Sequence, residues 1–387
     1  KIQNAISDSE DGDTIFVWNN SSPYYENLII DKEIKLIGKN RFKTIIDGSR
    51  KSDVITVLSH GVYISGFTII NSGNDWIDAG IKLESNNNII ENNIFSENNY
   101  GIYSYDLCNS VINDNIIINS SDSGIHLPFS NNITITNNEI SNNSLKGIFL
   151  YDSNVHCNNR NKIAYNTIKN NKQGIYFWFS YRTDIFENIL SNNIIGISFN
   201  HNSAYNSIIN NIIRENSDKG IFLNSSSNNN LNQNRITKND YGIYFRYSSC
   251  CDIINNLDIS FNDIGFFLDY SSNSYIENNN FNNNLIGLDL DHSTKSNIKN
   301  NTISNNKNIG IYLNQSSNNN IVQKNNFINQ PTHSFFENTY TNKWSKNYWD
   351  DWNNEGFYKI YGKISILDGF MSLKWLNFDF NPASIKN

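Results

Sequence analysis

The segment that decides the fold runs from residue 219 to residue 246 and reads KGIFLNSSSNNNLNQNRITKNDYGIYFR. A Gly followed by an apolar residue stands near its start at Gly220 and returns at Gly242. Positions one and three after each Gly are apolar, and this alternation is typical of a strand with one buried face. Two further apolar positions, Leu231 and Ile236, lie between the glycines among Asn-rich stretches. The segment therefore predicts one turn of chain built from short strands, with no room for a helix.

The same unit recurs along most of the chain. The Gly-apolar steps stand at Gly80, Gly101, Gly124, Gly147, Gly174, Gly196, Gly220, Gly242, Gly265, Gly287 and Gly310, at a mean interval of 23 residues. Three apolar columns per period predict three strands per turn and hence a right-handed parallel β-helix. A β-propeller needs a period of about 40 residues, and a leucine-rich repeat needs a different Leu spacing. We therefore expect an all-β solenoid.

Asparagine makes up 78 of the 387 residues, and much of it falls in register. An Asn stands at or near position fourteen of the repeat, as at Asn93, Asn115, Asn138, Asn188, Asn234, Asn256, Asn279 and Asn301. Turns of a β-helix stack about 4.8 Å apart, so equivalent side chains lie above one another. We predict that these amides form a hydrogen-bonded ladder inside the solenoid. A Ser that usually follows at position six is interpreted as a turn residue.

The pattern divides the chain into three parts of one continuous domain. Residues 1–60 are predicted to form an N-terminal cap and the first irregular turns, with a short helical piece over residues 2–6. Residues 61–330 carry the regular turns, and residues 331–387 form an aromatic-rich C-terminal cap. A solenoid needs such caps because its end turns expose unpaired strand edges. The chain starts without Met or an apolar leader, so we expect a signal segment upstream.

Composition excludes several classes of function. The formal net charge is −7 and there is no basic block, which argues against nucleic acid as a partner. No stretch approaches the ~18 apolar residues of a membrane-spanning helix. Only 17 % of the residues are charged and 13 % are aromatic, so the chain does not have the composition of a charge-driven disordered protein.

Three segments and the repeat together resemble a known family. The segments are 11–15 (DGDTI), 61–69 (GVYISGFTI) and 347–352 (NYWDDW). With the Asn- and Ile-rich turns, they resemble the NosD-like β-helix family, whose turns are also called carbohydrate-binding and sugar-hydrolysis repeats, and especially its archaeal secreted members. The resemblance implies the β-helix fold and export to the periplasm or the cell surface. It also implies a role in copper delivery, which the sequence does not support, because the chain has one Met and six scattered His.

Aromatic residues dominate the positions expected to project outward, two and four after each Gly. This outer stripe contains Tyr103, Tyr105, Phe149, Tyr151, Tyr176, Trp178, Phe222, Tyr244 and Phe267. Exposed apolar patches generally mark an interface, and flat rings with polar edges suit sugar faces. The leading hypothesis is therefore an exported or cell-surface protein that binds polysaccharide or another glycan. Alternatives are a structural or adhesive protein that self-assembles through the stripe, and a stripe covered by the C-terminal tail.

Toward the C-terminus the same positions become charged. Arg246, Asp269 and Asp291 share a column on consecutive turns, with Asp289 and His292 beside them. If the protein were an enzyme acting on polysaccharide as a lyase, epimerase or hydrolase, these five residues would be its catalytic candidates. We expect no cofactor, although Asp269 and Asp291 also fit a Ca²⁺ site. Neither a Gly-His-Gly nor an Arg-x-Lys pattern is present and Lys is sparse here, so catalysis is the less favoured hypothesis.

The four cysteines form no zinc pattern. Cys108 and Cys157 could meet only if the long turn between Gly147 and Gly174 bends back, and this turn is expected to bulge as a loop at residues 155–160. A bridge between the adjacent Cys250 and Cys251 would be strained. His156 and Cys157 lack an evident third metal ligand.

Overall fold

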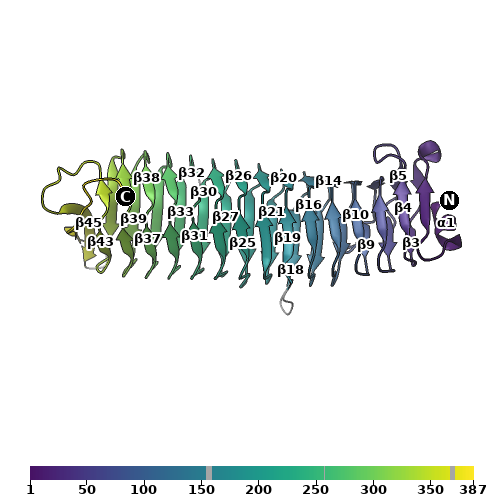
Figure 1. Cartoon of the computed structure of the whole chain (residues 1–387), viewed down its shortest axis with the longest axis horizontal. Coiled ribbons are helices and arrows are strands. Elements are labelled where there is room, and N and C mark those ends of the chain that lie inside the picture. The colour runs from purple at the N-terminus through teal and green to yellow at the C-terminus, as the bar shows by residue number, and fades with distance from the viewer. Residues whose placement is uncertain (154–158, 257, 367–370) are drawn as a thin grey trace. The chain divides into compact units, whose positions relative to one another are not determined.

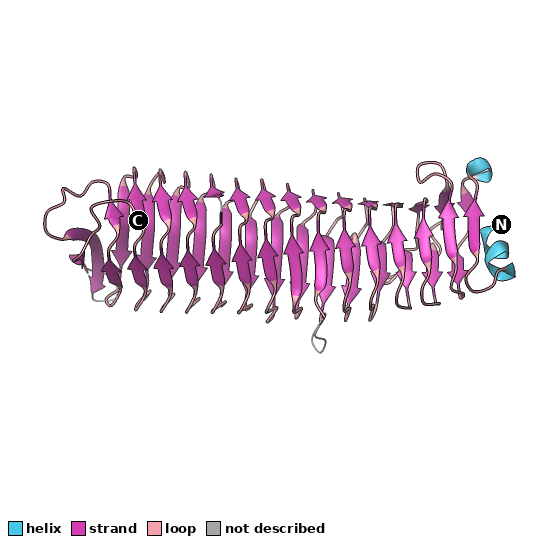
Figure 2. Ribbon diagram, viewed as in Figure 1, coloured by secondary structure: helices cyan, strands magenta, loops and turns pink. Residues whose placement is uncertain are grey.

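The computed structural model describes residues 1–153, 159–256, 258–366 and 371–387. Its contacts divide the chain into two compact units, Lys1–Ile194 (unit 1) and Ile195–Asn387 (unit 2). Each unit is a right-handed parallel β-solenoid, and the two comprise about 15 turns of about 23 residues. Strands make up nearly all of the regular structure (Figure 2). The predicted fold class is confirmed, including the three strands in each regular turn.

In unit 1, each turn contributes one strand to each of three parallel columns (Figure 1). The first column contains β3 (Leu28–Ile30), β6 (Ile55–Val57), β9 (Ala79–Leu83), β12 (Tyr100–Ser104), β15 (Ile125–Pro128), β18 (Lys146–Tyr151) and β21 (Gln173–Trp178). The second contains β1 (Thr14–Val17), β4 (Lys35–Gly38), β7 (Tyr63–Ser65), β10 (Ile89–Glu91), β13 (Val111–Asn113), β16 (Thr134–Thr136), β19 (Asn161–Ala164) and β22 (Thr183–Phe186). The third contains β2 (Tyr24–Tyr25), β5 (Ile45–Asp47), β8 (Thr68–Ile70), β11 (Ile94–Ser96), β14 (Ile116–Ile118), β17 (Glu139–Ser141), β20 (Thr167–Lys169) and β23 (Ile189–Ser191).

Unit 2 repeats the arrangement. Its first column contains β24 (Ile195–Asn200), β27 (Lys219–Asn224), β30 (Tyr241–Arg246), β33 (Ile264–Asp269), β36 (Ile286–Asp291), β39 (Ile309–Asn314) and β42 (Thr332–Glu337). Its second contains β25 (Ser207–Ile209), β28 (Asn230–Asn232), β31 (Asp252–Ile254), β34 (Tyr275–Glu277), β37 (Asn297–Lys299), β40 (Ile321–Gln323) and β43 (Lys343–Ser345). Its third contains β26 (Ile212–Arg214), β29 (Arg235–Thr237), β32 (Asp258–Ser260), β35 (Asn280–Asn282), β38 (Thr302–Ser304), β41 (Asn326–Ile328) and β44 (Tyr348–Trp349).

The first and last elements differ from the regular turns. Helix α1 (Ile2–Asp8) buries Ile2 and Ile6, as the sequence predicts, and the 3₁₀ turn η1 (Asn19–Ser21) follows β1. In unit 2, β45 (Tyr358–Ile366) continues the first column beyond β42 and pairs antiparallel with β46 (Met371–Asp379). Parallel pairing also extends past residue 330 through β42, β43 and β44, although the Gly period has ended there.

Asparagine ladders run inside both units, and there is more than one. In unit 2, Oδ1 of Asn234 accepts from the backbone N–H and the amide of Asn211, and this pattern repeats on later turns at Asn256, Asn279, Asn301, Asn325 and Asn347. In unit 1, the equivalent ladder links Asn115, Asn138, Asn166 and Asn188. The predicted ladder is confirmed by these bonds.

A second ladder was not predicted. It links Asn216, Asn239, Asn262, Asn284 and Asn306 in unit 2, and Asn143, Asn171 and Asn193 in unit 1. The Ser of position six is also more than a turn residue, because it is buried and bonds from turn to turn, as in Ser226, Ser248, Ser271 and Ser293.

In many Asn-Asn pairs, the two residues have different structural roles. The residue before a ladder Asn adopts a left-handed backbone, with φ of 56° at Asn137, 50° at Asn255 and 55° at Asn278. Asn tolerates this conformation better than most residues. The first Asn of a pair therefore makes the corner and the second enters the ladder.

The repeated Gly allows two turns to approach closely. A Cβ placed on Gly220 would lie 2.6 Å from the carbonyl oxygen of Gly242 on the next turn and 2.8 Å from Cγ2 of Ile236. These distances are shorter than real Cβ contacts, so the period of the sequence marks the places where only Gly fits.

Candidate functional site

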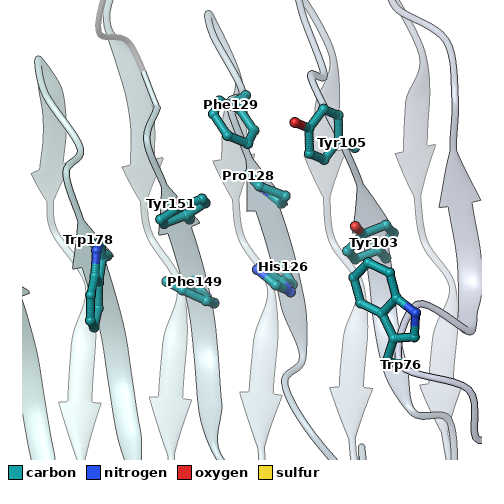
Figure 3. Close-up of a pocket in the computed structure, with 9 residues that line it drawn as sticks. All are labelled: Trp76, Tyr103, Tyr105, His126, Pro128, Phe129, Phe149, Tyr151 and Trp178. Atoms are coloured by element: carbon teal, nitrogen blue, oxygen red, sulfur yellow. The ribbon is translucent and has the colours of Figure 1, made fainter.

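The outer face of unit 1 contains a hollow of about 400 Å³ lined by rings from consecutive turns (Figure 3). Its lining is almost entirely carbon. The lining residues are Trp76, Tyr103, Tyr105, His126, Pro128, Phe129, Phe149, Tyr151 and Trp178.

One row of rings follows the middle of the first-column strands. The pairing of β12, β15, β18 and β21 places Tyr103 beside His126, His126 beside Phe149, and Phe149 beside Tyr176. The rings of His126 and Phe149 are stacked, with centroids 4.4 Å apart and planes at 13°. Phe149 and Tyr176 follow at 5.1 Å. The row arises because alternate residues of a strand share a face and equivalent turns repeat.

A second row lies where these strands end. The ring centroids of Tyr105 and Phe129 are 4.8 Å apart, and those of Phe129 and Tyr151 are 5.4 Å apart. Phe129 follows Pro128, the last residue of β15, and has a left-handed φ of 57°. Figure 3 shows the labelled rings of both rows on the same side of the ribbon.

Trp76 completes the rim from a loop rather than a strand. Its side chain is 79 % exposed. The loop is held by hydrogen bonds between Asp75 and Asp78, and Asn99 Nδ2 donates to the carbonyl oxygen of Asp75. An exposed indole on an anchored loop costs little to order when a ligand binds.

The predicted stripe is less exposed than its spacing implied. Tyr103 and Tyr176 are buried, at 6 % and 8 % exposure, because neighbouring rings of the same row cover them. Tyr105 is 62 % exposed, and Phe149, Tyr151 and Trp178 are half-buried. The expectation that every one of these positions projects freely into solvent is therefore wrong at Tyr103 and Tyr176.

Burial controls the charge of the hollow. It lowers the pKa of His126 to about 4, so the imidazole is neutral at pH 7. Burial also lowers the pKa of Lys146, whose Nζ lies 4.6 Å from the ring centroid of Phe149 and 5.4 Å from that of Tyr176. The pKa of Tyr176 is raised to about 12 by burial.

In unit 2, the predicted aromatic residues Phe222, Tyr244 and Phe267 form a separate group. The centroid distances are 5.2 Å between Phe222 and Tyr244 and 4.9 Å between Tyr244 and Phe267. Nζ of Lys219 lies 5.2 Å from the ring of Phe222. These rings are half-buried.

The charged residues predicted for unit 2 lie on neighbouring turns, and four of the five, Arg246, Asp269, Asp291 and His292, have a polar or charged partner. Asp269 Oδ2 accepts from the hydroxyl of Tyr244 at 3.0 Å and lies 3.4 Å from Nε of Arg246. Oδ1 of Asp291 lies 2.7 Å from Nδ1 of His292, whose ring stacks on Tyr270 at 4.3 Å. Among the described residues, no third His, Cys, Asp or Glu joins Asp269 and Asp291 in a group of converging ligand atoms.

Asp289 has the most perturbed carboxyl group in this region. It pairs in register with Phe267 on one side and Tyr312 on the other, so its carboxyl group lies in a row of rings. Its Oδ1 is buried and has no hydrogen-bond partner. Burial, and repulsion from Asp291, raise the pKa of Asp289 to about 7.

One group of the described residues has the composition of a metal site. His333 is buried, and its Nε2 lies 2.8 Å from Oδ1 of Asp350 and 3.2 Å from Oδ1 of Asp351. Nδ1 of His333 faces Nε2 of Gln330 at 3.2 Å. The amide of Gln330 is oriented by Asn306, which donates to its Oε1, and by the carbonyl oxygen of Ile303, which accepts from its Nε2. With the amide of Gln330 in this orientation, Nδ1 accepts from Gln330 and Nε2 faces the two carboxylates as a donor.

The remaining predicted sites are placed as follows. Cys250 and Cys251 are free thiols, and burial raises the pKa of Cys251 to about 12. The loop predicted at residues 155–160 falls largely, and His156 and Cys157 entirely, outside the described residues. Sequence reasoning missed Trp76, His126, Pro128 and Phe129 as parts of one hollow. His126 and Pro128 occupy the outward columns and could have been found there, whereas Trp76 lies outside the repeat.

Two family models match the sequence of this chain. The model of the family described as periplasmic copper-binding protein (NosD) matches residues 3–202, and the model of the right handed beta helix region matches residues 195–349. The chain belongs to the NosD family. No curated protein sequence matches this NosD-family chain.

Solved structures with similar folds share little sequence with the NosD-family chain. The mannuronan C-5 epimerase AlgE6 A-module of Azotobacter vinelandii is 13 % identical over 89 % of this chain and 92 % of its own, with a TM-score of 0.48. The DFA-IIIase of Arthrobacter chlorophenolicus A6 without its lid is 13 % identical over 68 % of this chain and 83 % of its own, with a TM-score of 0.50. Pectate lyase Pel9A is 12 % identical over 64 % of this chain and 78 % of its own, with a TM-score of 0.44. These likenesses concern the fold alone.

The family description raises the question of copper. Copper sites favour Cys, Met and His donors. In the described ranges, the group at His333 offers a single imidazole, already donating, and two carboxylates. This donor set does not fit copper, and we derive no step through that metal. The described part of the chain contains no helix with the length and apolar character needed to cross a membrane.

Proposed function

We propose that this NosD-family protein binds a polysaccharide chain in the aromatic hollow of unit 1. The observation that carries the proposal is the pair of ring rows that repeat at the spacing of the turns, with Trp76 at the rim. A linear polymer can use such a site because each turn offers an equivalent ring to the next part of the chain. The family description supports a periplasmic or extracellular location, where polysaccharides are accessible.

Ring chemistry supports a glycan as the ligand. Aromatic rings offer large flat surfaces that require little conformational ordering, and the exposed hydroxyl of Tyr105 adds a hydrogen-bonding edge. The hollow is open and elongated over several turns (Figure 3), which suits a chain more than a compact small molecule. Its volume lies in the range of specific ligand sites.

The test is whether the purified protein binds members of a polysaccharide panel. Binding is measured by affinity electrophoresis and by tryptophan fluorescence. Trp76→Ala and Tyr105→Ala remove exposed rings, so both variants are expected to fold and to lose at least about tenfold in affinity. Tyr275→Ala is the matched control, because Tyr275 is an exposed tyrosine of unit 2 outside the hollow. Binding that is absent from the panel, or unchanged in both variants, would contradict the proposal. Concentration-dependent association that Trp76→Ala abolishes would instead favour the self-assembling surface protein.

A second candidate is a polysaccharide-acting enzyme centred on unit 2. It is favoured by Asp289, whose pKa of about 7 suits a proton donor or acceptor at neutral pH. Asp269, Asp291, Arg246 and His292 would surround the substrate, and Asp269 and Asp291 are the residues that would hold a Ca²⁺ ion. The test is turnover of polysaccharides by the wild-type protein and by Asp289→Asn, with and without a chelator. If Asp289→Asn turns over polysaccharide as fast as the wild-type protein, Asp289 is not a catalytic residue and this second candidate is excluded.

A further inference from the structure

The nine residues that line the hollow of unit 1 include none with a formal charge at neutral pH. His126 is the one lining histidine, and burial lowers its pKa to about 4, so it is neutral at pH 7. Among the residues that the structure describes, no Lys, Arg, Asp or Glu lines the hollow. A charged ligand would therefore lose its hydration without gaining a direct ionic partner, which is costly.

Two lysines, Lys82 and Lys146, lie beside rings of these rows, and each already has contacts of its own. Nζ of Lys82 lies 2.8 Å from Oε1 of Glu84 and 3.9 Å from Oδ2 of Asp53. Lys146 lies over the faces of Phe149 and Tyr176, and its pKa is lowered because it is buried. The carboxylate of Asp122 interacts with both His126 and Lys146, and its negative charge acts to raise the pKa of each. A carboxylate on the ligand would compete with these acids for the same two lysines.

Unit 2, considered by itself, carries acids on its first-column face. Asp218, Asp240 and Asp263 precede consecutive strands, and the pKa of Asp240 is raised by partial burial and by repulsion from Asp263 and Asp218. Asp269 and Asp291 occupy the same column further on. A polyanion would be repelled from this face too.

From these observations we infer that the ligand is an uncharged glycan, and that the hollow of unit 1 discriminates against polyuronates and other acidic polysaccharides. The inference rests on the proposed function and names its substrate class. The C–H faces of neutral sugar rings pack on the two rows of aromatic rings, and Tyr105 contributes a hydroxyl at the rim. Neutral recognition of this kind is insensitive to salt, because no ion pair contributes.

The test compares polymers that differ only in charge. Polygalacturonate and its carboxyl-reduced product share a backbone, and a panel of neutral gluco-, manno- and xylo-oligosaccharides extends the comparison. We expect binding to at least one neutral polymer, at least about tenfold tighter than to the polyuronates, and unchanged between low and high salt. Tyr105→Lys, which adds a cation at the rim, should narrow this preference by strengthening polyuronate binding.

The outcomes separate the two claims. Tight, salt-sensitive binding of native polygalacturonate that depends on Trp76 and Tyr105 would overturn the inference and leave the proposed function intact. Absence of binding to every neutral and acidic polymer would overturn both. Neutral binding that survives Trp76→Ala and Tyr105→Ala would show that the glycan occupies another surface, and it would overturn both the proposed site and this inference.

Discussion

The carboxylate of Asp379 ends the asparagine ladder at Asn347. Its Oδ2 accepts hydrogen bonds from the backbone N–H and from Nδ2 of Asn347, both at 3.0 Å, and from Nε1 of Trp349 at 3.3 Å. Asp379 is fully buried on β46. Each ladder amide passes two donors to the next turn, so the last one needs a partner that only accepts, and a carboxylate is such a group.

Replacing Asp379 tests the end of the ladder. Asp379→Ala leaves three buried donors without an acceptor and is expected to lower the free energy of unfolding by about 3 kcal/mol or more. Asp379→Asn keeps one acceptor oxygen and should cost less than Asp379→Ala. The measurement is urea denaturation, with the exposed Glu355→Ala as control. Equal stability of Asp379→Ala and the control would contradict the role of this carboxylate.

Gly220 tests the close approach of adjacent turns. Gly220→Ala would place a Cβ against the backbone oxygen of Gly242 and is expected to cost about 2–3 kcal/mol. Gly356→Ala is the matched control, because Gly356 has a φ of 67° but no atom within 4 Å of the added Cβ. If Gly220→Ala costs no more stability than Gly356→Ala, the close contact between turns does not explain the Gly period, since Gly220 has no left-handed φ of its own.

His126 should make stability depend on pH. Its pKa is lowered from 6.5 to about 4, so the unfolded chain binds a proton more readily than the folded protein. Stability from this group is complete above pH 6.5 and is lost as pH falls toward 4, by at most about 3 kcal/mol. His126→Phe should reduce the change of the thermal unfolding midpoint between pH 6.5 and pH 4. An identical pH profile for both proteins would show that His126 is not the titrating group.

Asp289 should act in the opposite direction. Its pKa is raised from 3.8 to about 7, so its neutral form is favoured by folding, and stability falls as pH rises between these values. Asp289→Asn is expected to stabilise the protein at pH 8 by at most about 4 kcal/mol and to have little effect below pH 4. Asp252→Asn, at an exposed position of β31 in the same unit, is the control. A destabilising Asp289→Asn at pH 8 would indicate that the ionised group has a partner, such as a cation.

The fold could be predicted because its determinants are periodic. Each regular turn needs a Gly, such as Gly220 or Gly242, and an apolar alternation after it. Both features therefore repeat in the sequence and can be recognised there. The ladder through Asn234 was predictable for the same reason. The second ladder through Asn239 was missed because its Asn lies among corner residues of the same type, and sequence cannot tell an amide in a ladder from one in a left-handed turn.

The site was predictable only in part, because burial depends on neighbours. The spacing identified Tyr103 and Phe149 as members of one row, but it could not show that adjacent rings cover Tyr103. Trp76 joins the hollow from a loop whose path depends on the hydrogen bonds of Asp75 and Asp78. Such contacts lie outside any period, so the repeat carries no information about them.

The ladder that ends at Asp379 has a direction, and this direction restricts how such a solenoid can change in length. Every internal amide faces the same chemistry on both sides, so a whole turn can be duplicated or deleted within unit 2 without altering any other donor or acceptor. The terminal carboxylate cannot be copied into the interior in the same way, because there it would face an amide oxygen as well as an amide donor. Variation by complete turns in the middle, with the final acceptor retained, is therefore the route open to this architecture.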